Sequence, residues 1–383
     1  MEAKFYREEH RIFRNALQSF VNREIKPYTE KWEEERGIPR DLWYKMGEQG
    51  YLCPWIEERY GGAGAGFEYS LIIHEELGRS ECPGVVNGMG IHSDIIVPYL
   101  HHHGTEKQKE KYLPGCASGD IITCVAMTEP EAGSDLASIR TRAVRDGNDY
   151  IVNGEKIFIS NGISCNLSVT AVKTDPKAQP PHKGISVLLI EEGTPGFSKG
   201  RLLEKTGGHS MDTGELIFED CRVPVDNLLG EEGRGFHYLM YNLQQERLVL
   251  TIDAQVVAEY VLEKTIDYCK TRTVFGCPVS SHQHNTFKIV EMATEVEIGR
   301  TFLNSLIEDF IDGKDITLRV SMAKWWISEM VNRVAYHCTQ LHGGYGCARE
   351  YFVARVPGDV RYMTIAAGTT EIMKVIIGNI MGL

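Results

Sequence analysis

The spacing of apolar residues changes twice along this chain, and each change limits the kind of structure that can form there. Apolar residues recur every three or four positions in residues 1–120 and again in residues 229–383, which predicts helices in both segments. Residues 121–228 contain short runs rich in Val, Ile, Leu and Phe, which predict strands. We therefore expect an α+β multidomain protein with an N-terminal helical domain, a middle antiparallel β domain and a C-terminal four-helix bundle.

Turn signals support the β assignment of the middle segment. Asp146-Gly147 and Asn153-Gly154 separate successive apolar runs, and short strands at that spacing predict a small sandwich or barrel. A glycine-rich stretch in the N-terminal segment, Gly61–Phe67, is different. No strand precedes it and no GK[ST] follows it, so we expect a loop between helices and not a phosphate-binding loop.

Charge and composition exclude several classes of function. The chain has 383 residues and a net charge of −12, which argues against nucleic-acid binding, because that needs a surplus of Lys and Arg on one face. No run of about 18 apolar residues is present, so we expect no membrane insertion. The ten cysteines include no CxxC pair, and three consecutive histidines, His101 to His103, would point in different directions on a helix. We therefore expect no metal site.

Five polar or glycine-containing segments carry the candidate chemistry. AMTEPEAGSD (126–135) directly follows an apolar run, and its hydroxyls and backbone amides suit the polar edge of a cofactor or a phosphate. The other four are GEKIFISNG (154–162), RTVFG (272–276), QLHGGYG (340–346) and AAGTTEIM (366–373). Each segment alone also fits an ordinary loop, a surface helix end or a helix C-cap. Their combination is far more specific than any one of them.

In order and spacing, these segments resemble the acyl-CoA dehydrogenase family, most closely its long-chain and isovaleryl types. The resemblance runs along essentially the whole chain and implies the helical, β, helical domain order expected above. It also implies FAD as the cofactor. The implied reaction removes an α-proton and a β-hydride from a coenzyme A thioester, passes the hydride to flavin N5 and leaves a 2,3-enoyl-CoA.

The resemblance also implies which residues meet the two ligands. Residues expected to bind FAD are Met127, Thr128, Phe158, Ser160, Arg272, Phe275, Gln283, Gln340, Gly343, Gly344, Thr369 and Glu371. Among them, Phe158 would stack on the isoalloxazine, while Arg272 and Phe275 would reach the FAD of a neighbouring subunit. Residues expected to contact the substrate are Ser134, Arg247, Asn87, Ile91, Ala366 and Ala367.

The catalytic base needs separate treatment, because the reaction requires a carboxylate at the α-carbon. Many members of the family place it immediately before the Gly-Thr of the last segment, where this chain has Ala367. The long-chain and isovaleryl types instead carry it in an E-R-L motif on the first helix of the C-terminal bundle, which Glu246-Arg247-Leu248 matches. We expect Glu246 to be the base, with a pKa raised by burial. The alternative is an exposed helix glutamate.

Asp94 departs from the expected apolar lining of the acyl pocket. Asn87, Ile91, Asp94 and Pro98 would share one face of a helix that lines this pocket in the family. A carboxylate in apolar surroundings is costly unless it has a partner or a task. Asp94 is therefore either a cap or solvated residue, or a second catalytic base acting on a cyclic or functionalised acyl group.

Other functions remain open at this stage. An acyl-CoA oxidase or flavin monooxygenase would let O₂ reach the reduced flavin, and rapid reoxidation in air would identify it. A non-catalytic acyl-CoA-binding subunit would fit Ala367 but not Glu246. Bleaching of the flavin by an acyl-CoA would exclude that subunit.

Partners and location follow from the resemblance and from the N-terminus. The family passes electrons to an electron-transferring flavoprotein and usually forms homotetramers, as dimers of dimers. The first residues are charged and amphipathic, without a secretory or transit pattern. We therefore expect a cytoplasmic protein, or a mitochondrial matrix protein if the chain is a processed eukaryotic one.

Overall fold

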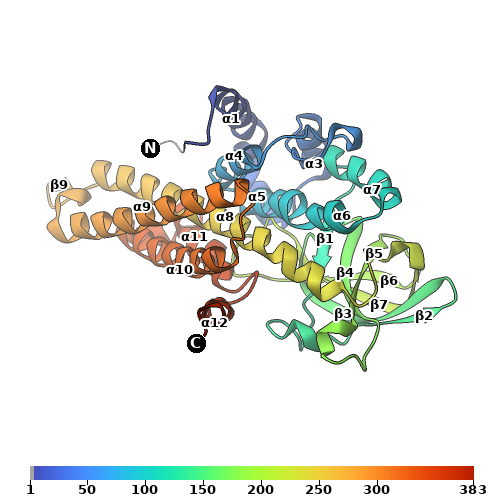
Figure 1. Cartoon of the computed structure of the whole chain (residues 1–383). Coiled ribbons are helices and arrows are strands. Elements are labelled where there is room, and N and C mark those ends of the chain that lie inside the picture. The colour runs from blue at the N-terminus through green and yellow to red at the C-terminus, as the bar shows by residue number, and fades with distance from the viewer. Residues whose placement is uncertain (1–3) are drawn as a thin grey trace.

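The order of elements is helical, then β, then helical, which confirms the expected fold class (Figure 1). The computed structural model describes residues 4–383. The N-terminal helices are α1 (Glu8–Phe20), α2 (Thr29–Glu35), α3 (Arg40–Glu48), α4 (Phe67–Gly78), α5 (Pro83–Gly90), α6 (Val97–His103) and α7 (Glu106–Ser118). Of the stretch Gly61–Phe67, residues 61–66 lie between a short 3₁₀ turn and α4, as expected of a loop, and Phe67 begins α4.

A π-helical turn, η4 (Ile91–Ile96), joins α5 to α6 in one continuous helical run. Its cause is visible in the sequence: Pro98 has no N–H, so the carbonyl of Asp94 lacks the donor that an α-helix would supply. The side-chain amide of Gln245 donates to that carbonyl instead, at 2.8 Å. The π turn also interrupts the α-helical spacing that predicted a common face for Asn87 and Asp94.

One curled sheet forms the middle of the chain. Its strands are β1 (Thr123–Ala126), β2 (Arg142–Asp146), β3 (Asp149–Ser160), β4 (Leu167–Lys173), β5 (Ile185–Glu191), β6 (Phe197–Leu202) and β7 (Thr213–Pro224). They are ordered β1-β4-β2-β3-β7-β6, with β5 also on β4. Most neighbours are antiparallel, as expected, but β4 pairs in parallel with β1 and β2. Apolar patterning identifies strands without fixing their partners, so these two pairings were not foreseen.

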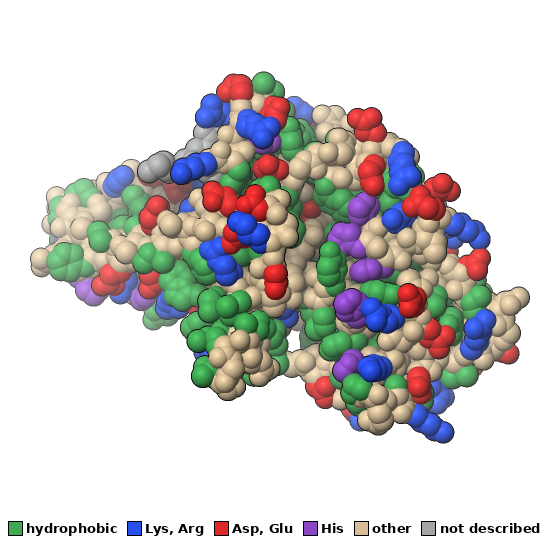
Figure 2. Space-filling model, in the orientation of Figure 1, with side chains coloured by type: hydrophobic (Ala, Val, Ile, Leu, Met, Phe, Trp, Pro, Cys, Tyr) green, Lys and Arg blue, Asp and Glu red, His purple; other side chains and the backbone are tan. Residues whose placement is uncertain are grey.

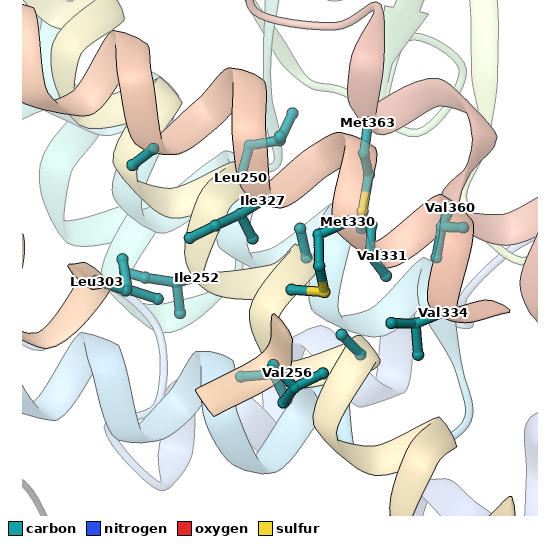
Figure 3. Close-up of a cluster of buried hydrophobic side chains, with 14 of the residues drawn as sticks. Leu250, Ile252, Val256, Leu303, Ile327, Met330, Val331, Val334, Val360 and Met363 are labelled. Carbon is teal, nitrogen blue, oxygen red and sulfur yellow. The ribbon is translucent and has the colours of Figure 1, made fainter. Parts of the chain in front are cut away.

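The C-terminal bundle is built on one long helix. The helices are α8 (Gly235–Thr271), α9 (Gln283–Ile311), α10 (Thr317–Leu341), α11 (Phe352–Val360) and α12 (Thr370–Met381), with the hairpin β8 (Thr273–Val274) and β9 (Cys277–Pro278) between α8 and α9. Figure 3 shows Leu250, Ile252 and Val256 of α8 packed with side chains of α9 and α10. Because α8 also contacts α4, η4 and β5, it carries buried residues on all sides.

Residues from all three segments pack together in one hydrophobic core. One buried cluster combines Tyr99 and Leu100 of α6, Leu167 of β4 and Leu239 of α8. The boundaries predicted at residues 120 and 228 fall in connections between elements and remain predictions. Within residues 4–383, no helix combines the length and apolar character needed to cross a membrane.

The start of α8 is seated directly on the sheet, which gives a test of this packing. A Cβ at Gly235 would lie 2.6 Å from the backbone carbon of Ser186 on β5. Gly235→Ala should therefore destabilise the protein by about 1–3 kcal/mol through overpacking. A Cβ added at Gly378, on α12, would meet no atom within 4 Å.

Gly378→Ala is the matched control, and it should stabilise by about 0.5–1 kcal/mol because alanine favours helix over glycine. Thermal unfolding of both variants measures whether the first loses stability and the second gains it. A stabilised Gly235→Ala would contradict the seating of α8 on β5.

Candidate functional site

Glu246 lies in the interior, on the face of α8 that packs against α6. The residue is 6% exposed, and its Oε1 accepts a hydrogen bond of 2.6 Å from the hydroxyl of Tyr99. Burial raises the pKa of the Glu246 carboxyl to about 7, although the Tyr99 hydrogen bond and the charge of Arg247 oppose the shift. A carboxyl that titrates near neutrality suits proton abstraction from a carbon acid. The exposed-glutamate alternative is therefore wrong.

Arg247 and Lys324 together hold a turn of the C-terminal segment. Nε of Arg247 donates to the carbonyl of Ala367 at 3.2 Å, and Nζ of Lys324 donates to the carbonyl of Gly368 at 2.5 Å. Ala367 adopts φ +54°, a left-handed conformation that costs an alanine roughly 1 kcal/mol. The two cations thus fix a strained turn in the chain just after Ala366, which is itself half-buried.

Lys324 was not anticipated from the sequence. It lies on α10, is fully buried, and burial together with the nearby charge of Arg247 lowers its pKa to about 8. A signal was available: Val320, Lys324, Ile327 and Val331 recur at helical spacing, so the lysine falls within an apolar stripe. A lysine in such a stripe needs a buried partner, and the Gly368 carbonyl is that partner.

The T-x-E segment begins α12. The hydroxyl of Thr369 accepts a hydrogen bond from the backbone N–H of Ile372 at 3.3 Å, which makes it the N-cap of this helix. Glu371 is exposed in the first turn. Because Thr369 follows the turn held by Arg247, this segment lies at the Glu246 end of the bundle.

The carboxylate of Asp94 is hydrogen-bonded to polar partners and does not face an open apolar pocket. Its Oδ1 accepts from the Ser70 hydroxyl at 2.7 Å, and its Oδ2 lies 3.2 Å from Nε2 of His74. Nδ1 of His74 lies 2.7 Å from Oδ1 of Asp253. Although burial opposes it, the two carboxylates raise the pKa of His74 to about 10, so the imidazolium bridges them. Both carboxylate oxygens of Asp94 thus have hydrogen-bond partners. The hypothesis of a second base was motivated by an unpartnered carboxylate, and the structure does not show one at Asp94.

Asn87 and Ile91, from the same helical run, lie in different surroundings. The amide oxygen of Asn87 accepts from the Tyr362 hydroxyl at 2.8 Å, which ties α5 to the segment that precedes Ala366. Ile91 packs in the cluster that contains Tyr99 and Met127. Ile91 and Met127, from two different domains, therefore pack against the same buried cluster that contains Tyr99.

The segment that contains Met127 and Thr128 is fastened to β3. The Thr128 carbonyl accepts from the N–H of Ile157 at 3.0 Å, and Nζ of Lys156 donates to the Met127 carbonyl at 3.0 Å. Lys156 also forms an ion pair of 2.8 Å with Glu129. Burial lowers the pKa of Lys156 to about 8, although Glu129 opposes the shift. This buried pair, which the sequence pattern does not reveal, fixes the loop beside Phe158.

Phe158 projects from an irregular part of β3. It has φ +60° and a 65% exposed ring, and the register of β3 against β7 shifts between Lys156 and Ile159. An exposed aromatic ring held in a strained conformation offers a flat apolar face to a ligand. Ser160, two residues on, is half-buried, and Ser134 is exposed.

The remaining predicted residues gather at the other end of α8. Arg272 is the C-cap that directly follows α8, and its guanidinium lies 5.8 Å from the centre of the Tyr345 ring. The other members of this group are all exposed: Phe275, Gln283, Gln340, Gly343 and Gly344. Phe275 is 98% exposed, in the hairpin that Figure 1 shows at the end of the molecule opposite the sheet. A Cβ at Gly343 or Gly344 would meet nothing within 4 Å, so the backbone there is open to a ligand.

The predicted cofactor residues thus form two groups within one chain. Arg272 lies roughly 39 Å from Glu246 along α8, at the rise of an α-helix. The Arg272 group therefore lies far along α8 from Glu246.

Comparison with known proteins identifies the family of the chain. Models of the acyl-CoA dehydrogenase N-terminal, middle and C-terminal domains match residues 7–120, 124–221 and 233–382. The long-chain specific acyl-CoA dehydrogenase of Sus scrofa is 42% identical over 98% of this chain and 87% of its own length.

Two solved structures extend the comparison. An acyl-CoA dehydrogenase from Geobacillus kaustophilus is 54% identical, with a TM-score of 0.98 over 100% of both chains. A glutaryl-CoA dehydrogenase from Mycobacterium smegmatis, solved in complex with FADH2, is 28% identical, with a TM-score of 0.91 over 98% of this chain and 95% of its own.

The buried Lys156–Glu129 pair generates a prediction. Lys156→Met leaves the Glu129 carboxylate buried without its cation, which should cost about 3–5 kcal/mol of stability and loosen the Met127–Thr128 loop. Thermal unfolding and protease sensitivity of this loop measure both effects. Lys199→Met on β6, which breaks the more exposed pair with Glu192, should cost at most about 1 kcal/mol. Equal costs for the two variants would contradict the role given to Lys156.

Proposed function

The chain belongs to the acyl-CoA dehydrogenase family, and on that premise we propose that Glu246 removes the α-proton of an acyl-CoA thioester, giving a 2,3-enoyl-CoA. The observation that carries the proposal is the buried Glu246 carboxyl with a pKa near neutrality. Ala367, which stands at the other position used for the base in the family, has no acidic group. Glu246 is therefore the carboxylate that we assign to the α-carbon.

The proposed cofactor is FAD, and the residues present fit it. Phe158 offers an exposed ring beside the polar edge of Met127 and Thr128, where a flavin would stack and hydrogen-bond. Ser160 and Thr369 would add hydroxyls to the same site. The chemistry that FAD supplies when bound is acceptance of the β-hydrogen as a hydride.

The second group of cofactor residues leads to a proposal about assembly. We assign Arg272 and Phe275 to the FAD of a neighbouring copy, with Arg272 on the pyrophosphate as a charged fork. Gln283, Gln340, Gly343, Gly344 and Glu371 complete the set that we assign to FAD.

Figure 2 shows hydrophobic side chains gathered over α12, where Val375, Ile380, Met381 and Leu383 are exposed. Such apolar surfaces suit burial between copies, in line with a dimer of dimers.

Substrate contacts are assigned at both ends of the thioester. Arg247 would hold the coenzyme A portion or orient Glu246, and Ser134 would meet the same portion from the loop. Ile91 and Ala366 would lie along the acyl group, with Asn87 beyond them. The small side chains of Ala366 and Ala367 leave room for a branched or cyclic chain. An electron-transferring flavoprotein is the proposed acceptor.

Replacing the proposed base tests this mechanism. Glu246→Gln should lower kcat about 10²- to 10⁴-fold, because it removes the general base and keeps the side-chain shape. Turnover is measured with a dye acceptor and palmitoyl-CoA, isovaleryl-CoA and cyclohexanecarboxyl-CoA. Glu263→Gln, an exposed change on the same helix, should leave turnover unchanged. Normal turnover by Glu246→Gln, with loss in Asp94→Asn, would move the base to Asp94.

The pH dependence gives an independent prediction. A base must be ionised to act, and burial raises the pKa of Glu246 to about 7, so kcat/KM should rise with pH to half its maximum near pH 7. The rate should therefore fall as pH drops below 7. A half-maximum near 4.5, the ordinary value of a glutamate, would contradict the burial of the working carboxyl.

A further inference from the structure

Tyr99 and Glu246 form a buried hydrogen bond between α6 and α8. Tyr99 is fully buried, in a cluster with Leu100 of α6 and Leu239 of α8. Its hydroxyl donates a hydrogen bond of 2.6 Å to Oε1 of Glu246. A buried tyrosine hydroxyl needs an acceptor, and a buried carboxyl needs a donor, so each group meets the requirement of the other. Within residues 4–383, the structure gives Oε2 of Glu246 no hydrogen-bond partner.

Two adjacent residues of α8 fix how this pair meets. Gln245 donates to the carbonyl of Asp94 in the π turn, and Glu246 accepts from Tyr99. The first bond depends on Pro98, which leaves the Asp94 carbonyl without an α-helical donor. Together the two bonds set the register of the η4–α6 run against α8, so the tyrosine hydroxyl is directed at the carboxyl of Glu246.

We propose that Tyr99 is a positioning residue for the catalytic carboxyl: it binds Oε1 and leaves Oε2 as the atom that receives the α-proton. This inference rests on the proposed function of Glu246. The tyrosine does not touch the substrate in this scheme. It restricts the rotation of the carboxyl about its terminal bond and stabilises the ionised form, because its O–H donates to the charged oxygen.

Titratable groups on the neighbouring elements must be included when the titration of the pair is considered. Arg247 follows Glu246 on α8, and its positive charge favours the carboxylate. Lys324 of α10 lies near Arg247, and Asp94 of η4 and His103 of α6 flank Tyr99 along the helical run. Burial lowers the pKa of His103 to about 4, so this histidine is neutral where Glu246 titrates. Only Tyr99 hydrogen-bonds the carboxyl within residues 4–383. Its removal should therefore raise the pKa of Glu246 further, since burial remains and a stabilising donor is lost.

The test is Tyr99→Phe in the FAD-loaded enzyme, assayed with the best substrate of the acyl-CoA panel. The acidic limb of the kcat/KM profile should move upward by about one pH unit, as expected for loss of a hydrogen bond to a charged group. Tyr112→Phe is the matched control, because this buried tyrosine also donates to a carboxylate, Glu191, at 2.9 Å. It should leave the profile in place.

A spectroscopic readout separates positioning from a general loss of structure. The infrared C=O band of protonated Glu246, identified by its absence in Glu246→Gln, should titrate at higher pH in Tyr99→Phe than in wild type. An unmoved band and an unmoved pH profile, with Glu246→Gln inactive, would overturn the role of Tyr99 and leave the base in place. An active Glu246→Gln would instead overturn the proposed function itself.

Discussion

Burial of the Glu246 carboxyl constrains everything packed around it. Raising its pKa from 4.5 to about 7 corresponds to about 3 kcal/mol of preference for the protonated form in the fold. The penalty on the ionised form is therefore absent at low pH and grows as pH rises from the ordinary value of a glutamate toward 7. The rest of the protein must tolerate this penalty at the pH where the base works. Tyr99 and Arg247 reduce it without removing it.

Helix α8 connects this constraint to the rest of the molecule. Its start rests on β5, Glu246 faces α6, and its far end carries the hairpin with Phe275. A rigid helix thus fixes the distance between the proposed base and the residues assigned to a neighbouring copy. The turn at Ala367 is fastened to the same helix by Arg247, and to α10 by Lys324. In the proposed function, one helix therefore carries both the base and the residues assigned to a neighbouring copy.

The sequence predicted the parts of this account that depend on local pattern. The order of helical and β segments follows from apolar spacing, and Glu246 was found through its E-R-L motif. The partners of Glu246 and Asp94 could not be found in this way. Tyr99 lies far from Glu246 in sequence and His74 lies on a different helix from Asp94, and only tertiary packing brings each pair together. The π turn shows an intermediate case, because Pro98 was visible but its effect depends on Gln245 of another helix.

Exchange of the substrate α-proton with solvent reports directly on the central claim that Glu246 is the base. Wild-type enzyme, incubated in D₂O with a β,β-dimethyl acyl-CoA that has no β-hydrogen to lose, should incorporate deuterium at the α-carbon, as measured by mass spectrometry. Glu246→Gln should show no exchange above the uncatalysed rate while still binding the thioester. Exchange at the wild-type rate in this variant would contradict the account.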